Sequence, residues 1–98
     1  MIKINIDIPY TNITNYLVVF GNMEDDERTK VILNISEAFL EDIANGRTDY
    51  SNIFEQYIWT IEKLAEQKHK TNRDIVITEH GIKITILAAD KAEFDAIN

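Results

Sequence analysis

The segment FEQYIWTIEKLAEQ, residues 54–67, has the apolar spacing of an amphipathic α-helix, and its apolar face sets the side on which a core forms. Asp49 or Ser51 fits the N-cap, and lysines near the other end complement the helix dipole. We therefore predict one long helix over residues 52–70. At about 3.6 residues per turn, one broad face of it collects the following side chains: Tyr50, Ile53, Phe54, Tyr57, Ile58, Ile61, Leu64 and Ala65.

Trp59, the single tryptophan, falls on the opposite side of this predicted helix. Its neighbours on the helical wheel are Glu55, Glu62 and Glu66. Two interpretations remain open: another element of the chain covers the indole, or the indole contacts a second molecule. In the second case, a carboxylate frame around a tryptophan suits a Lys- or Arg-bearing partner, because a cation is attracted to the ring face.

Upstream of this helix the sequence predicts three strands. The opening alternation places Ile2, Ile4, Ile6 and Ile8 on one side of a strand that Pro9 ends. A polar stretch follows over residues 11–15, and residues 16–20 are typical of a central strand. Residues 21–29 form a predicted connection to an antiparallel strand over residues 30–35. A helix over residues 24–44 competes with this assignment, but its β-branched residues disfavour it.

The remaining elements are marked by local signals. Ser36 fits the N-cap of a short helix over residues 37–45, which Gly46 ends. Strands are predicted at residues 75–77 and 82–86, joined by a tight turn in which Gly81 adopts a positive φ. A capping box at residues 90–93 starts a terminal helix over residues 91–97.

The order is thus β-β-β-α-α-β-β-α, which predicts a single α+β domain over residues 1–98. We expect an antiparallel sheet of about five strands, with the long helix packed across one face and two short helices beside it.

Composition excludes several classes of function. There is no cysteine, so disulfides, thiolate catalysis and cysteine-ligated metals are ruled out. No signal-peptide pattern and no run of 18 apolar residues is present, so we expect a cytoplasmic protein without membrane contact. The formal charge is −7, with 17 acidic against 10 basic residues, and it opposes direct nucleic-acid binding.

Two charged runs stand out. Glu24, Asp25, Asp26 and Glu27 are consecutive; they form either a solvated loop or a contact loop for a basic partner, and they lack the spacing of a calcium-binding EF-hand. The basic run over residues 68–73 suits helix capping better than phosphate contact. Neither histidine has a metal-ligand spacing and no nucleophile motif is present. We therefore expect no catalytic residue, no bound metal and no cofactor.

These features predict a small, acidic, non-catalytic interaction protein that binds a basic or nucleic-acid-binding surface of a larger protein. In size and charge the chain resembles small acidic phage-encoded inhibitors of bacterial defence, anti-CRISPR proteins among them, although no motif carries the likeness. The alternative is a self-assembling subunit that forms a homo-oligomer through Trp59 or an open sheet edge, and a small enzyme or ligand-binding domain ranks last. The expected protein-binding residues are Trp59, Glu55, Glu62, Glu66, Glu24, Asp25, Asp26 and Glu27.

Overall fold

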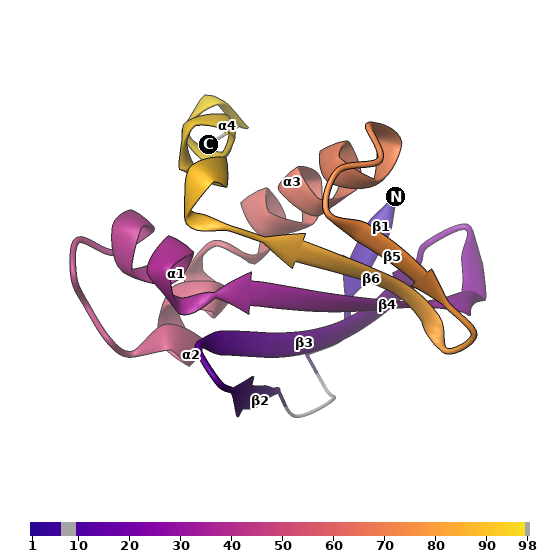
Figure 1. The fold of residues 1–98 in the computed structure, drawn as a ribbon, viewed down its shortest axis with the longest axis horizontal. Helices are drawn as coiled ribbons and strands as arrows, with labels where there is room; N and C mark the ends of the chain where they lie inside the picture. Colours follow the sequence, from indigo (N-terminus) through magenta and orange to yellow (C-terminus); the bar gives the residue numbers. More distant parts are fainter. Residues whose placement is uncertain (7–9, 98) are drawn as a thin grey trace.

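A computed structural model describes residues 1–6 and 10–97, and within them the chain forms a mixed α+β fold of six strands and four α-helices (Figure 1). The first half contains β1 (Ile2–Ile4), β2 (Thr11–Ile13), β3 (Tyr16–Met23), β4 (Asp26–Ser36) and α1 (Glu37–Ile43). The second half contains α2 (Tyr50–Gln56), α3 (Ile58–Lys70), β5 (Ile75–Thr78), β6 (Gly81–Ile86), a 3₁₀ turn η1 (Ala88–Asp90) and α4 (Lys91–Ile97).

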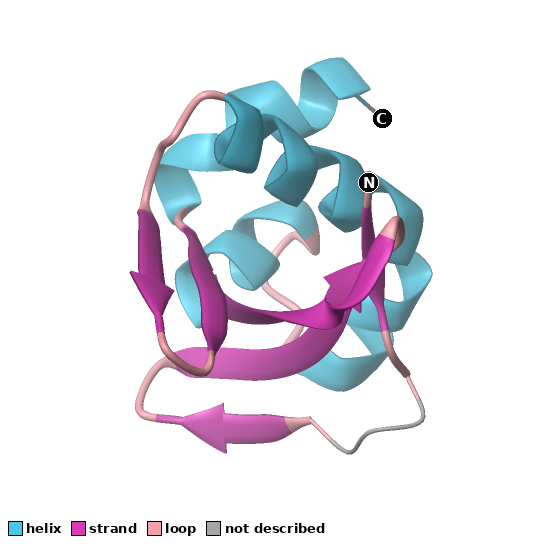
Figure 2. Ribbon diagram, turned by 90° about the vertical axis from the view of Figure 1, so that its right-hand side faces the viewer, coloured by secondary structure: helices cyan, strands magenta, loops and turns pink. Residues whose placement is uncertain are grey.

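The strands lie in the order β1-β3-β4-β6-β5, and β2 also pairs with β3. β1 pairs with residues 21–23 of β3 and β2 with residues 16–18, so both lie along the same edge of β3. The helices gather on one side of the sheet (Figure 2). Among the described residues, no helix lies on the opposite side of the sheet.

The core lies between the sheet and the helices. Alternate strand residues point into it, since successive side chains of a strand face opposite sides. α2 and α3 contribute the apolar stripe predicted from residues 54–67, with Phe54, Ile61 and Leu64 fully buried. The strand residues that join them in the core are Ile2, Ile4, Leu17, Val19, Val31, Leu33, Ile35, Ile84 and Ile86.

The predicted purely antiparallel sheet is wrong at one pair, because β4 and β6 run parallel. The chain leaves β4, passes through three helices, and returns as the β5–β6 hairpin. That hairpin places β6, not β5, beside β4. Both hairpin strands are rich in isoleucine, so the sequence did not show which of them would occupy the inner position.

The predicted long helix is divided at Tyr57, where φ is −115° and ψ is 19°. No glycine or proline marks this break. Aromatic contacts with other elements lie close to this break. The ring centroids of Phe54 and Tyr10 are 5.2 Å apart and those of Tyr57 and Phe94 are 5.4 Å apart, each pair edge-on. The prediction of a single helix over residues 52–70 was therefore wrong, although both helices bury the expected face.

Two predictions for the first strands were also wrong. β1 ends at Ile4, and Ile6 is 59% exposed, while Ile8 and Pro9 lie outside the described residues. Residues 11–15, described above as a polar stretch and not as a strand, contain β2. This strand is fully exposed, so it carries no alternation of buried and exposed residues that the sequence pattern could reveal.

The predicted connection over residues 21–29 is instead a tight hairpin. β3 continues to Met23 and β4 starts at Asp26, with a register irregularity between Asn22 and Met23. Gly21 lies inside β3 where a Cβ atom would come within 2.3 Å of the Lys3 carbonyl oxygen, so only glycine fits between β3 and β1 there. The strand assignment over residues 30–35 is confirmed against the competing helix.

Several local predictions are confirmed. The Ser36 hydroxyl accepts a hydrogen bond from the Ala38 N–H at 3.2 Å, as an N-cap does. Gly46 and Gly81 adopt φ values of +87° and +138°, which favour glycine. The predicted capping box at residues 90–93 was wrong, because Asp90 and Glu93 bond to residues outside α4.

Candidate functional site

Trp59 lies on the outer side of α3 with 60% of its surface exposed. Ile61 and Leu64, on the other side of the same helix, are fully buried. The Lys63 ammonium lies over the indole, 5.7 Å from the ring centroid, so one ring face already has a cation from the same helix. No element of the described chain covers Trp59 as a core residue.

The three glutamates predicted to frame Trp59 each have a contact within the chain. Glu55 accepts a hydrogen bond from the Tyr10 hydroxyl, Glu62 accepts one from the Ile4 N–H at 2.7 Å, and Glu66 forms an ion pair with Lys70 at 3.1 Å. Their carboxylates are therefore tied to neighbouring elements and are less available to a partner than the helical wheel suggests.

Glu62 has a structural task that the sequence did not reveal. Its carboxylate bonds to the outward N–H of β1 and thereby closes one edge of the sheet. Burial raises the pKa of Glu62, while the hydrogen bond from Ile4 opposes that rise. Glu62 and Glu24 also line one hollow of about 200 Å³, together with Met1, Ile2 and Lys3. Two acidic side chains that are far apart in sequence thus border the same hollow.

The acidic run occupies the tip of the β3–β4 hairpin. Glu24 and Asp25 form the turn, and Asp26 and Glu27 begin β4; all four are exposed. The Asp26 carboxylate accepts from the Arg28 N–H at 3.2 Å and from the Thr29 hydroxyl at 2.8 Å, which holds the turn in shape. Within residues 1–6 and 10–97, no group of three metal-ligating side chains comes together.

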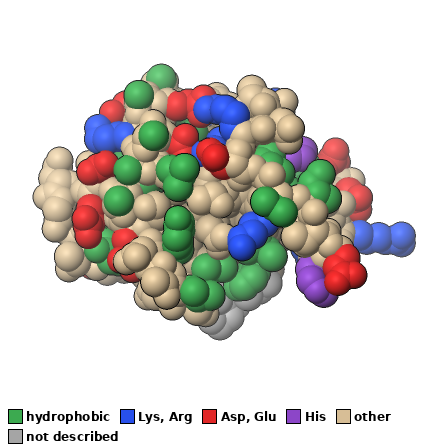
Figure 3. All heavy atoms as spheres, in the orientation of Figure 1, with side chains coloured by type: hydrophobic (Ala, Val, Ile, Leu, Met, Phe, Trp, Pro, Cys, Tyr) green, Lys and Arg blue, Asp and Glu red, His purple; other side chains and the backbone are tan. Residues whose placement is uncertain are grey.

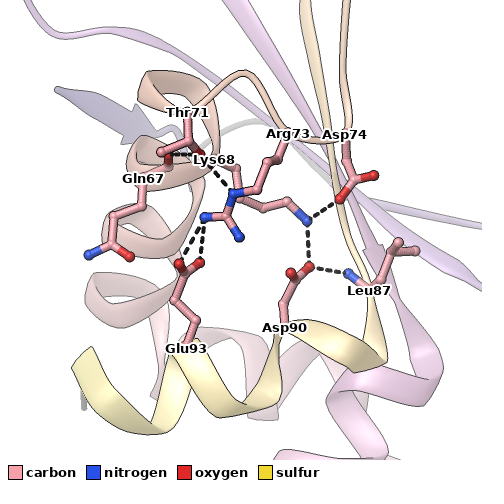
Figure 4. Close-up of polar contacts among 8 residues, drawn as sticks. All are labelled: Gln67, Lys68, Thr71, Arg73, Asp74, Leu87, Asp90 and Glu93. Carbon is pink, nitrogen blue, oxygen red and sulfur yellow. Dashed lines mark hydrogen bonds and ion pairs between the residues drawn. The ribbon is translucent and has the colours of Figure 1, made fainter.

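The basic run over residues 68–73 forms internal ion pairs (Figure 4). The buried Lys68 ammonium lies 2.5 Å from Asp90 and 2.7 Å from Asp74. Arg73 donates two hydrogen bonds of 2.8 Å to Glu93. These contacts join α3, the start of β5 and α4, so the run stabilises the fold and does not present a set of free cations.

The uncovered face of the sheet is a second surface, and sequence reasoning missed it. Ile13 and Val76 on this face are 56% and 57% exposed. Phe20 and Ile32 line a hollow of about 310 Å³ beside Lys30. In Figure 3, hydrophobic side chains gather over the strands in the lower half of the view. The available signal was that β3 and β4 carry apolar residues on both faces, which a one-sided sheet does not require.

The tyrosine–carboxylate contacts predict a distinctive alkaline titration. Hydrogen bonding to Glu55 raises the pKa of Tyr10 from 10.0 to about 12, and the bond to Glu41 does the same for Tyr50. A raised folded-state pKa means that the stabilisation is present below about pH 10 and is lost as pH rises through about 12. We expect tyrosinate absorbance to show two late-titrating groups, and Glu55→Gln to return one of them towards its ordinary pKa. Two late groups in the variant would contradict the Tyr10–Glu55 contact.

The chain matches no protein-family model, no curated protein and no solved structure. Among the described residues, no helix is both long and apolar enough to span a membrane.

Proposed function

We propose that this chain is a small non-catalytic interaction protein that binds a basic surface of a larger protein, with Trp59 as its anchor. The exposure of Trp59, at 60%, is the observation that carries the proposal. Tryptophan is enriched among interface residues that dominate binding energy, because a large apolar ring loses water on contact. Trp59 belongs to a helix whose buried face is already complete, so the fold does not need the indole.

Charge supports a basic partner. The four exposed acids lie at the tip of the β3–β4 hairpin, and Glu24 borders the same hollow as Glu62 of α3 beside β1. The net charge of −7 attracts a positively charged protein surface over a distance set by the salt concentration. A nucleic-acid-binding groove presents such a surface, and an inhibitor that occupies it fits the size and charge of this chain. The proposed role is that of phage-encoded inhibitors such as anti-CRISPR proteins, which the chain resembles in size and charge.

Replacing Trp59 with alanine separates binding from folding. We expect the free energy of unfolding in urea to change by no more than about 0.5 kcal/mol, since the indole is mostly in water. Affinity for a partner captured by the wild-type chain should fall by about 2 kcal/mol, as loss of an aromatic anchor does. Titration calorimetry with that purified partner measures the second change.

Ile13→Ala is the matched control, because Ile13 is 56% exposed but belongs to β2. It should leave both stability and affinity nearly unchanged. Unchanged affinity in Trp59→Ala, or a large loss of its stability, would contradict the proposal. A complex that does not weaken as salt rises would contradict the basic nature of the partner.

A further inference from the structure

The two outer edges of the sheet differ in how they are protected. At β1, the Glu62 carboxylate accepts the Ile4 N–H, so that edge cannot readily receive another strand. At the opposite edge lies β5, which among the described strands pairs with β6 alone. Figure 2 shows these two edges at opposite sides of the molecule. Open strand edges are templates for pairing, and proteins usually block them with charge, proline or a bulge.

β5 has none of these protections within Ile75–Thr78. Val76 is 57% exposed and Ile77 is 78% exposed, the highest value among the large hydrophobic side chains described. Exposed apolar residues on both faces of one edge strand are unfavourable in water, since their burial is the main driving force for association. The edge therefore has the side chains of an interface.

The hydrogen-bonding pattern of the β5 backbone determines which kind of partner can pair with this edge. Thr78 pairs with Gly81 across a two-residue turn, and the Asp74 carbonyl bonds to the Thr85 N–H at 3.0 Å. Because hydrogen-bonded and non-bonded pairs alternate in an antiparallel ladder, Val76 bonds inward to β6, whereas Ile75 and Ile77 direct their N–H and C=O outward. No hydrogen bond within residues 1–6 and 10–97 reaches these outward groups. A second extended strand satisfies all of them.

We propose that β5 pairs antiparallel with β5 of a second copy of this chain, with Val76 opposite Val76 across a two-fold axis. In this register Ile75 of each copy lies opposite Ile77 of the other. Every outward N–H and C=O of these two residues then has a partner, and both exposed apolar side chains meet apolar side chains. Sliding the strands until Ile77 faces Ile77 would leave Ile75 opposite Glu79 in the turn, which is a poorer match.

Charge around β5 permits this self-pairing despite the acidic net charge. Lys83 lies beside Val76 in the sheet, so the centre of the interface is not acidic. In the proposed register, Arg73 at one end of β5 approaches Glu79 at the other end in the second copy. Glu79 has 89% of its side chain exposed, and Arg73, although bonded to Glu93, has 41% exposed, so Glu79 can approach the solvent side of the guanidinium. A strand from a different protein would not in general place opposite charges beside Arg73 and Glu79.

The β5 edge is separate from the Trp59 surface, because β5 and Trp59 lie on different elements and either contact can exist without the other. A dimer formed through β5 leaves both Trp59 side chains exposed. It also presents two copies of the acidic hairpin to a larger partner, which strengthens binding through effective concentration if both copies engage.

Sedimentation velocity over a range of protein concentrations tests the proposal. We expect the wild-type chain to shift from monomer to dimer mass as concentration rises. Val76→Lys should stay monomeric, because it places two lysines directly opposite each other in the interface. Ile13→Lys, an equally exposed change on β2, and Trp59→Ala should both keep the dimer.

Amide hydrogen exchange of the wild-type chain gives a second readout that needs no variant. Protection of the Ile75 and Ile77 amides should increase with protein concentration, while the Val76 amide, already bonded to β6, should change little. A monomer mass at concentrations up to about 1 mM would overturn the proposal. So would a dimer that survives Val76→Lys, because another surface of the chain would then hold the two copies together. A dimer that Trp59→Ala dissolves would place the interface on α3 instead.

Discussion

Replacing Lys68 with methionine is expected to lower the free energy of unfolding by about 3–5 kcal/mol. The Lys68 side chain is fully buried and its ammonium contacts Asp90 and Asp74. Methionine fills a similar volume but leaves the nearly buried Asp90 carboxylate without its counter-ion. Desolvation of an unpaired charge is costly, and that cost outweighs the apolar gain of methionine. Urea denaturation measures the change.

A double-variant cycle tests the physical cause. The Asp90 carboxylate accepts a hydrogen bond from the Leu87 N–H at 2.8 Å. Asp90→Asn removes the charge but keeps an oxygen that can accept this bond. The Lys68→Met/Asp90→Asn protein should therefore lose clearly less stability than the two single changes added together. Additive losses would mean that the two side chains do not form the coupled pair shown in Figure 4. Lys70→Met, which removes the ion pair between an exposed lysine and the partly buried Glu66, should cost less than about 1 kcal/mol.

Replacing Phe54 with alanine is expected to lower the free energy of unfolding by about 3–5 kcal/mol through loss of buried area and the cavity that remains. Phe54 is fully buried at the end of α2 and its ring contacts Tyr10 at 5.2 Å. Gln56→Ala, an exposed change two residues later in α2, should alter stability by no more than about 0.5 kcal/mol. Equal losses in the two variants would contradict the assignment of the apolar face.

The apolar stripe of residues 54–67 could be predicted because it depends only on helical periodicity. The same is true of the Ser36 cap and of the glycine turns at Gly46 and Gly81, since each is specified by its immediate neighbours. The outward position of Trp59 followed from the same periodicity. These features are local, and local physical chemistry is what a single sequence records most directly.

The features that escaped prediction depend on residues far apart in the chain. Burial of Lys68 requires Asp90, which is 22 residues away, and closure of the β1 edge by Glu62 spans 58 residues. Likewise, the parallel pairing of β4 with β6 depends on how the three-helix connection returns to the sheet. The role of Trp59 and of the acidic residues stays a prediction, since exposure shows only that they are accessible.

Fluorescence of Trp59 tests the central claim most directly, because it is the only tryptophan in the chain. In the free protein we predict a red-shifted emission that acrylamide quenches readily, as expected for an indole that is 60% exposed. Upon addition of the captured partner, the emission should shift to the blue and become protected from acrylamide. Two results would contradict the account. One is an indole that is shielded from acrylamide in the free protein. The other is an indole that stays equally quenchable in a saturated complex with a tryptophan-free partner fragment.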